Sequence, residues 1–243
     1  MEFQDFIIKI DRIFGLNPDI ESPTDEQIKK LYALTERMLK VNESMNLTAI
    51  TDIDGVILKH YVDSLTISKL IPRDASLIDV GCGAGFPTLP LAIARPDIKI
   101  TALDGTAKRI EYVRSTAELL GLDNVVAIAG RAEEYAVKPE YRESFDVATA
   151  RAVAALPVLA ELCIPFVKKG GEFIAMKASQ GENEASSAAN AIKLCGGSIG
   201  GIEKIDLVGD GTCDQRIIIR ISKIAATPSR YPRHYSQISK KPL

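Results

Sequence analysis

The chain has 243 residues, 46% of them hydrophobic, which is enough for one large domain with an appendage and a substantial core. A net charge of −2 argues against nucleic-acid binding through overall charge alone. Because no run of about 18 apolar residues occurs and the first residues alternate charged with apolar side chains, we expect a cytoplasmic protein with no membrane partner.

Residues 1–70 are predicted to form an N-terminal helical extension. Apolar residues recur at helical spacing between Phe3 and Phe14, which predicts a first helix. The segment Thr24-Asp25-Glu26-Gln27 has the form of a capping box and predicts the start of a second helix. A loop is expected over residues 42–51.

A third helix is predicted over residues 54–70. Its i, i+3 and i+4 spacing places His60, Asp63 and Ser64 on one face. His60 is a candidate RNA contact, because a histidine on such a face can reach a ligand. The alternative is that its ring is only hydrogen-bonded within its own helix.

From residue 71 to residue 223 the sequence predicts a separate α/β domain with a seven-stranded, mostly parallel sheet. Apolar strands alternate with helical stretches, as in sheets with crossover helices. The glycine-rich piece 196–201 is interpreted as a turn. The predicted strands lie near 77–80, 98–103, 125–129, 145–150, 171–177, 202–208 and 215–221, and the helices near 87–95, 106–120, 132–138, 155–168 and 182–195.

The segment LIDVGCGAGFPTLP, residues 77–90, predicts a ligand-binding loop. A strand buried on both faces breaks into Gly81, Gly83 and Gly85, and Pro87 then suits the first turn of a helix. Glycines at this position leave no side chain in the way. A small ligand can therefore lie against bare backbone at the carboxyl end of the strand, where open α/β sheets place their sites.

The residues around the loop favour S-adenosylmethionine over a nicotinamide cofactor, which remains an alternative. Phe86 occupies the place of the third glycine of dinucleotide folds. Asp79 precedes the first glycine and suits a ligand with a cationic amino group. Asp104 ends the next strand, where a carboxylate can accept hydrogen bonds from ribose. The segment 130–134 follows the third strand, where an adenine ring could rest.

The position of a methyl-acceptor loop after the fourth strand is occupied by Thr149-Ala150-Arg151-Ala152, which lacks the motif of exocyclic-amine methyltransferases. The four cysteines are scattered, so we expect free thiols and no metal site. Cys213 is better explained as a small hydrophobic residue than as a nucleophile. Guanine N7 has a free lone pair and needs no base. Arg151 and Lys177 end strands and could hold the guanine edge or flanking phosphates, with surface charge as the alternative.

Other candidate RNA contacts lie outside the strand ends. Lys108 and Arg109 open the helix after Asp104, where the helix dipole disfavours cations, so either anion contact or plain exposure explains them. Residues 223–243 carry 5 of the 30 basic residues and none of the 32 acidic ones, so the tail is +5 and the remainder −7. We expect a basic C-terminal tail over 224–243 that binds an anionic partner, a solvated end being the alternative. Its candidate contacts are Arg230, Arg233, Lys240 and Lys241.

With these residues, the chain resembles the glucose-inhibited division protein B family, which are bacterial small-subunit ribosomal RNA guanine-N7 methyltransferases. The resemblance covers nearly the whole chain. The glycine loop alone is shared by many methyltransferases. Its combination with the basic tail and with the predicted helix over residues 54–70 that carries His60, here called the histidine helix, is far more specific. The segments that carry the resemblance are Asn46-Leu47-Thr48, His60-Tyr61-Val62-Asp63-Ser64-Leu65, Ile78–Pro90, Leu103-Asp104, Lys108-Arg109, Arg131-Ala132-Glu133-Glu134, Ala150-Arg151-Ala152, Met176-Lys177, Tyr231-Pro232-Arg233 and Lys240-Lys241-Pro242-Leu243.

The resemblance implies a class I, Rossmann-like methyltransferase fold and a set of site residues. Arg151 is implied to lie beside donor and substrate, and we take it as the catalytic residue. The chain departs from the family pattern in two places, at Gly105-Thr106-Ala107 after the second strand and at Ser236 in the tail. The residues implied or predicted to bind the donor are Asp79, Gly81, Gly83, Gly85, Phe86, Asp104, Ala132, Glu133 and Arg151.

The implied reaction is methyl transfer from S-adenosylmethionine, with S-adenosylhomocysteine as product, to a guanosine of 16S ribosomal RNA. An acidic enzyme with a small basic tail fits a structured target, so we expect it to act on an assembled or partly assembled small subunit. We also expect a monomer. The alternatives are a methyltransferase for another RNA site or a small molecule, and a non-catalytic ribosome-assembly factor. For a true RNA enzyme, deleting residues 228–243 is expected to abolish RNA activity and to spare donor binding.

Overall fold

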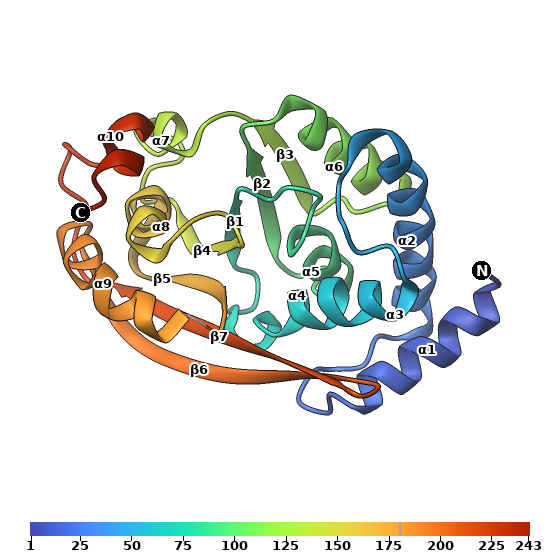
Figure 1. The fold of residues 1–243 in the computed structure, drawn as a ribbon. Coiled ribbons are helices and arrows are strands. Elements are labelled where there is room, and N and C mark those ends of the chain that lie inside the picture. Colours follow the sequence, from blue (N-terminus) through green and yellow to red (C-terminus); the bar gives the residue numbers. More distant parts are fainter. Residues whose placement is uncertain (180) are drawn as a thin grey trace.

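The computed structural model describes residues 1–179 and 181–243, and its centre is a seven-stranded sheet in the order β3-β2-β1-β4-β5-β7-β6 (Figure 1). Strands β1 to β5 are parallel, and β7 runs antiparallel to both β5 and β6. The prediction of a seven-stranded, mostly parallel α/β sheet is confirmed. The strands are β1 (Ser76–Val80), β2 (Lys99–Asp104), β3 (Val125–Ala129), β4 (Phe145–Arg151), β5 (Val167–Ala178), β6 (Gly197–Gly209) and β7 (Thr212–Lys223).

The strand order reverses at β1, because β2 lies on one side of it and β4 on the other. Loops that leave the carboxyl ends of β1 and β4 therefore separate and leave a crevice between them. In open α/β sheets this switch point is where ligands bind. The glycine loop follows β1 directly, so the topology brings it to this crevice.

The prediction of a turn at residues 196–201 is wrong for all but its first residue. Gly197 already pairs with Lys223, and β6 continues from there with an irregular register between Ile199 and Gly201. Glycine suits this strand because a Cβ at Gly197 would lie 2.8 Å from the Ile221 side chain. The result is a long β6–β7 hairpin that extends beyond the sheet toward the N-terminal helix (Figure 1).

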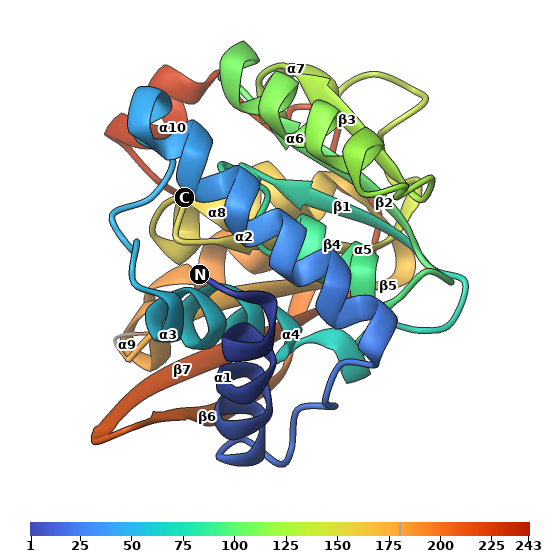
Figure 2. The same ribbon diagram turned by 90° about the vertical axis from the view of Figure 1, so that its right-hand side faces the viewer.

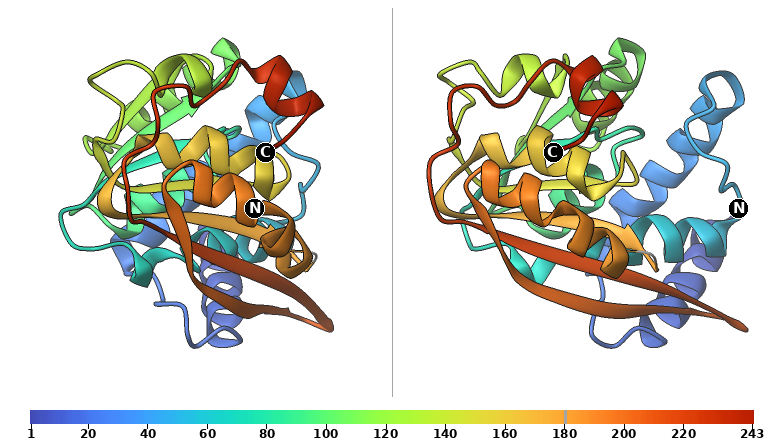
Figure 3. Two further views of the ribbon diagram at one scale, coloured as in Figure 1. Left: turned by 90° about the vertical axis from the view of Figure 1, so that its left-hand side faces the viewer. Right: turned by 60° about the vertical axis from the view of Figure 1, so that its left-hand side comes forward.

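Helices cover both faces of the sheet. Figure 2 shows α2 across one face, and Figure 3 shows the opposite side of the molecule. None of the helices within the described residues has the length and apolar composition needed to cross a membrane. One face carries α1 (Phe3–Gly15), α2 (Asp25–Met45), α3 (Ile53–Val56), α4 (Asp63–Leu65), α5 (Thr88–Ala94) and α6 (Ala107–Leu119), and the other α7 (Ala132–Tyr135), α8 (Leu156–Cys163), α9 (Gly181–Leu194) and α10 (Tyr235–Lys240).

The N-terminal helices share one hydrophobic cluster with the sheet. Phe6 and Ile10 of α1 and Leu31 of α2 are buried in the same cluster as Leu77 of β1. The next residue of β1, Ile78, faces the cluster on the other side of the sheet. The division into 1–70, 71–223 and 224–243 stays a prediction.

Local signals at the N-terminal helices have mixed outcomes. The capping box is confirmed: Gln27 N–H donates to Thr24 Oγ1 and Thr24 N–H to Gln27 Oε1, and α2 begins at Asp25. The single helix predicted over 54–70 is instead a succession of helical turns, with a π-helical stretch at Ile57–Val62 between α3 and α4. A π-helical turn inside a helix is frequent at functional sites, and His60 lies in this one.

The loop after α1 holds the end of the β6–β7 hairpin. The Asn17 side-chain amide donates to the Val208 carbonyl at 2.8 Å, and the Val208 N–H donates back to Asn17 Oδ1 at 2.9 Å. Arg12 of α1 also pairs with Asp210 at the hairpin turn, with 2.6 Å between Nη1 and Oδ2. Segments far apart in the chain are thereby joined at one corner of the molecule.

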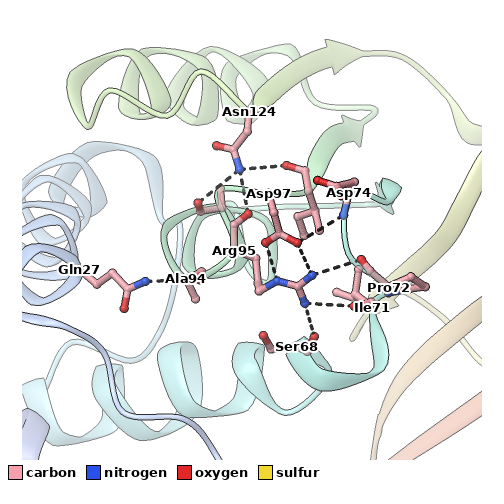
Figure 4. A network of polar contacts seen from close by, with 11 residues as sticks. Gln27, Ser68, Ile71, Pro72, Asp74, Ala94, Arg95, Asp97 and Asn124 are labelled. Atoms are coloured by element: carbon pink, nitrogen blue, oxygen red, sulfur yellow. Dashed lines mark hydrogen bonds and ion pairs between the residues drawn. The ribbon is translucent and has the colours of Figure 1, made fainter.

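A network around Arg95 fixes the amino ends of the strands (Figure 4). Its guanidinium donates to three carbonyls within residues 68–72 and forms a two-point contact with Asp97. Asn124, just before β3, donates to the carbonyls of Arg95 and Ile98. These contacts tie together the segments that enter β1, β2 and β3, so this edge is structural.

The C-terminal tail is packed against the α8 side. Arg233 donates through Nε and Nη2 to the carboxylate of Glu161, which is fully buried. Arg142 donates to the carbonyls of Thr227 and Tyr231. Tyr231 is itself buried. The tail is therefore anchored at several points and is not a free solvated end.

Candidate functional site

Two adjoining cavities lie at the carboxyl ends of the strands. The first, here called the loop cavity, has a volume of about 370 Å³. The second, the β3 cavity, has about 220 Å³ and shares Gly81, Asp104 and Arg109 with the first. Of the residues predicted from the sequence, the loop cavity brings together His60, Gly81, Gly83, Phe86, Asp104, Arg109 and Arg151, and the β3 cavity adds Ala132 and Glu133.

A larger cavity lies elsewhere. It has about 800 Å³ and lies at the amino ends of the strands, lined by residues such as Lys99, Gly121 and Asn124. None of the predicted site residues lines it. Because its walls belong to the structural edge described above, volume alone does not identify the site.

The three loop glycines are required for different reasons, although φ is positive at all of them. A Cβ at Gly81 would lie 2.7 Å from the Val153 side chain, and one at Gly85 would lie 2.6 Å from Leu89. Gly85 therefore shapes the loop and does not line either cavity. A Cβ at Gly83 would meet nothing closer than the Gly81 carbonyl at 3.9 Å. Gly83 is the glycine that keeps the loop cavity open.

Asp104 at the end of β2 holds the glycine loop in place. Its Oδ2 accepts from Gly83 N–H at 3.0 Å, and its Oδ1 accepts from Thr106 N–H at 2.7 Å. A carboxylate has about four lone-pair positions, so both oxygens keep capacity for a ligand hydroxyl. The helix after β2 begins at Ala107 despite the unusual Gly105-Thr106-Ala107 sequence.

Asp79 lies beneath the loop and not in a cavity wall. Its side chain is fully buried, and Oδ2 accepts from the Thr88 hydroxyl at 2.6 Å. Its other oxygen, Oδ1, has no hydrogen-bond partner among the described residues. Burial raises the pKa of this carboxyl to about 6. A direct contact between Asp79 and a donor stays a prediction.

His60 and Phe86 form a stacked pair in the wall of the loop cavity. Their ring centroids are 4.3 Å apart and the planes differ by 8°. The His60 Nε2 is 2.9 Å from the Thr48 hydroxyl, so the ring's partner lies outside its own helix. Burial, and then the charge of Arg151, lowers the pKa of His60 to about 4. The ring is therefore neutral at pH 7.

Arg151 is held at the end of β4 by contacts that leave part of its guanidinium unused. Its Nη1 donates to Asp63 Oδ2 and to the Lys59 carbonyl, each at 3.0 Å. The second Asp63 oxygen pairs with Arg216 Nε of β7 at 3.2 Å. Among the described residues, Nε and Nη2 of Arg151 have no such partner. The guanidinium carbon is 5.6 Å from the Phe86 ring centroid.

The remaining basic candidates do not line either cavity. Lys177 is nearly buried, donates to the Ala154 carbonyl at 2.7 Å and pairs with Glu184 at 2.8 Å. Arg233 is paired with Glu161. Their binding of RNA stays a prediction, as it does for the exposed residues Lys108, Arg230, Lys240 and Lys241.

Sequence reasoning missed two features of the site. The ion pair of Asp63 with Arg151 joins the histidine helix to β4, and no local pattern signals it. Tyr235, in the tail, lines the β3 cavity. The sequence signal that could have identified Tyr235 as a site residue is its position as an aromatic residue among the basic residues of the tail.

The pKa values of Asp79 and His60 predict opposing effects of pH on stability. The pKa of Asp79 rises from 3.8 to about 6, so its contribution to the free energy of unfolding is lost as pH rises through 6. The pKa of His60 falls from 6.5 to about 4, so its contribution is lost as pH falls from 6.5. Each effect amounts to about 2 kcal/mol between pH 4.5 and 6.5.

We therefore expect urea unfolding of the wild-type protein to depend only weakly on pH in this window. The Asp79→Asn variant should gain stability as pH rises, because only the His60 effect remains. The His60→Asn variant should lose stability over the same range. If the free energy of unfolding changed with pH to the same extent in the wild-type protein and in Asp79→Asn, the assignment of a raised pKa to Asp79 would be contradicted.

Comparisons with known proteins come from sequence and from structure. A family model described as rRNA small subunit methyltransferase G matches residues 27–205. The ribosomal RNA small subunit methyltransferase G of Acetivibrio thermocellus is 43% identical over 95% of this chain and 92% of its own length. The protein of the same name from Limosilactobacillus reuteri is 45% identical over 90% of this chain and 92% of its own.

Solved structures resemble this one in fold at low sequence identity. The O-methyltransferase of Bacillus cereus in complex with SAH has a TM-score of 0.57 and 19% identity, with 89% of this chain and 100% of that chain covered. The TYW2 protein of M. jannaschii in complex with AdoMet has a TM-score of 0.54 and 15% identity, with 67% and 75% covered. Both likenesses concern the fold alone.

Proposed function

The chain belongs to the rRNA small subunit methyltransferase G family, and on that premise we propose that it methylates N7 of a guanosine in 16S ribosomal RNA with S-adenosylmethionine as donor. S-adenosylhomocysteine is then the second product. The observation that carries the proposal is the convergence of Gly83, Phe86, Asp104 and Arg151 on one cavity at the switch point of the sheet.

The residues present fit the donor. Gly83 leaves open space in the loop cavity, and the β3 cavity adjoins it through Gly81 and Asp104. An elongated ligand can therefore occupy both. In this proposal Gly81, Gly83 and Phe86 contact the donor in the loop cavity, and Asp104 accepts from its ribose. Ala132 and Glu133 line the space for its adenosine.

The described cavity walls suit an acceptor that needs no nucleophile. The bound sulfonium supplies an activated methyl group, so catalysis consists mainly of aligning the acceptor with it. Guanine N7 has a lone pair and no proton to lose. The pKa of His60 is lowered to about 4, which makes its ring a weak base, and burial raises the pKa of the Cys82 thiol, so that it stays protonated.

Arg151 is the residue we propose to hold the acceptor base. The free guanidinium donors can bond to guanine O6, which shares an edge of the base with N7. Methylation at N7 makes the base cationic, which an unpaired arginine would oppose. Asp63 offsets part of the charge of Arg151, although the same carboxylate also pairs with Arg216, so the repulsion between Arg151 and the methylated base is reduced.

We also propose that the enzyme acts as a monomer on an assembled or partly assembled small subunit. The chain is acidic apart from its tail, so loose RNA finds few attractive surfaces on it. Arg230, Lys240 and Lys241 are exposed in the tail, and a small number of such cations suits a shaped target. Equal methylation rates on protein-free RNA and on isolated subunits would reject this preference.

Mass mapping of methylated nucleosides tests the reaction itself. Isolated small subunits are incubated with labelled S-adenosylmethionine, with and without the protein, and their RNA is digested to nucleosides. We expect label in N7-methylguanosine alone. Label in another nucleoside would show that guanine N7 is not the methyl acceptor. Absence of label from RNA, with the donor still bound, would leave the non-catalytic assembly factor as the better explanation.

A further inference from the structure

The β3 cavity has a wall that comes from the C-terminal tail. Tyr235, the first residue of α10, lines it together with Gly130, Ala132 and Glu133 from the segment after β3. The guanidinium carbon of Arg131 lies 4.6 Å from the Tyr235 ring centroid. Figure 1 shows α10 beside α7, although the two are about a hundred residues apart in the chain.

The position of Tyr235 is fixed from both sides. Two residues before it, Arg233 binds the buried carboxylate of Glu161 through its backbone N–H, Nε and Nη2. Three residues after it, Ile238 is fully buried in the cluster on the α8 side. A side chain between two such anchors is a built part of the wall and does not depend on a mobile end.

The lining of the β3 cavity suits a purine nucleoside. Val80, Leu103 and Leu162 supply apolar surface, and Asp104 and Glu133 supply acceptors for hydroxyl and amino groups. An aromatic ring adds the kind of surface on which bases are most often held. Tyr235 supplies that ring, and the side chain is 39% exposed, so it is accessible to a ligand.

We propose that the tail forms a third wall of the donor site, with Tyr235 contacting the adenosine part of S-adenosylmethionine. This inference rests on the proposed donor. It also assigns residues 228–243 a role in donor binding, whereas the sequence alone led us to expect donor binding without them. The basic tail then serves the donor site as well as the RNA.

Titration calorimetry of the full chain with S-adenosylhomocysteine and with methylthioadenosine tests the inference. Both probes contain the adenosine part, and only the first contains the amino acid part. The Tyr235→Ala variant should weaken both by about ten-fold, since an aromatic contact with the base is lost. Tyr235→Phe should retain wild-type affinity. Gln237→Ala, at an exposed position on the same helix, is the matched control.

Four other results of these binding measurements would each contradict one part of the inference. If the wild-type protein binds neither probe, the proposed donor is wrong. If it binds both and Tyr235→Ala binds them equally well, the tail wall is wrong while the proposed function stands. Unchanged donor binding with weakened binding of small-subunit RNA would place Tyr235 in the RNA surface instead. A loss confined to S-adenosylhomocysteine would overturn the assignment to the adenosine part.

Discussion

Replacing Gly83 with valine is expected to abolish donor binding while the protein remains folded. The valine side chain would enter the loop cavity, where the glycine leaves open space. Backbone strain at φ of +56° adds a cost, because L side chains rarely adopt that conformation. We expect the dissociation constant for S-adenosylhomocysteine to rise at least about 100-fold, or about 3 kcal/mol, by calorimetry.

Gly121→Val is the matched control for Gly83→Val. Its φ of +60° gives similar strain, and a Cβ there meets no atom within 4 Å, but it lies at the amino ends of the strands. Both variants should therefore lose similar stability, on the order of 1 to 3 kcal/mol, and only Gly83→Val should lose the donor. Retained affinity in Gly83→Val would refute the assignment of the loop.

Arg151→Ala should lower turnover much more than donor affinity. Arg151 lines the loop cavity, and in our proposal its guanidinium holds the acceptor base, whereas the glycine loop and Asp104 hold the methyl donor. We expect kcat for small-subunit RNA to fall roughly 100-fold or more, which is the usual effect of removing a hydrogen-bond donor that contacts the reacting group. The donor dissociation constant should change by no more than about threefold. Single-turnover kinetics and calorimetry measure the two quantities.

Arg216→Ala separates a direct role of Arg151 from the ion pair around Asp63. Arg216 binds the same carboxylate and lines neither cavity. Asp63 keeps one arginine partner in either variant, so the structural loss is comparable. A turnover loss in Arg216→Ala as large as in Arg151→Ala would mean that the network matters more than the free donors of Arg151. If the affinity for the methyl donor fell as far as kcat, Arg151 would only bind the methyl donor and would have no role in holding the acceptor base.

The sheet and the glycine loop could be predicted because their signals are local. Alternating apolar runs and helical stretches indicate strands and crossovers, and closely spaced glycines indicate a turn with backbone conformations that other residues rarely adopt. The same reasoning failed at residues 197–201, where glycines lie inside β6. That strand is specified by its pairing with β7, and pairing is not visible in composition.

The partners of charged residues could not be predicted. From the sequence, Lys177 is expected to be a free cation at a strand end and Arg233 a free cation in a basic tail. In the folded chain Lys177 pairs with Glu184, and Arg233 pairs with Glu161. Such pairs depend on which helix packs against which strand. The burial of Asp79 has the same origin, because α5 covers the end of β1 only in the folded chain.

The reciprocal hydrogen bonds between Asn17 and Val208 have a consequence for biosynthesis. The chain is made from its N-terminus at about 5 to 20 residues per second, so the loop after α1 leaves the ribosome many seconds before its partner strand exists. That corner can close only after residue 208 has been made. The loop after α1, although made early, is therefore among the last parts of the chain to reach its final neighbours.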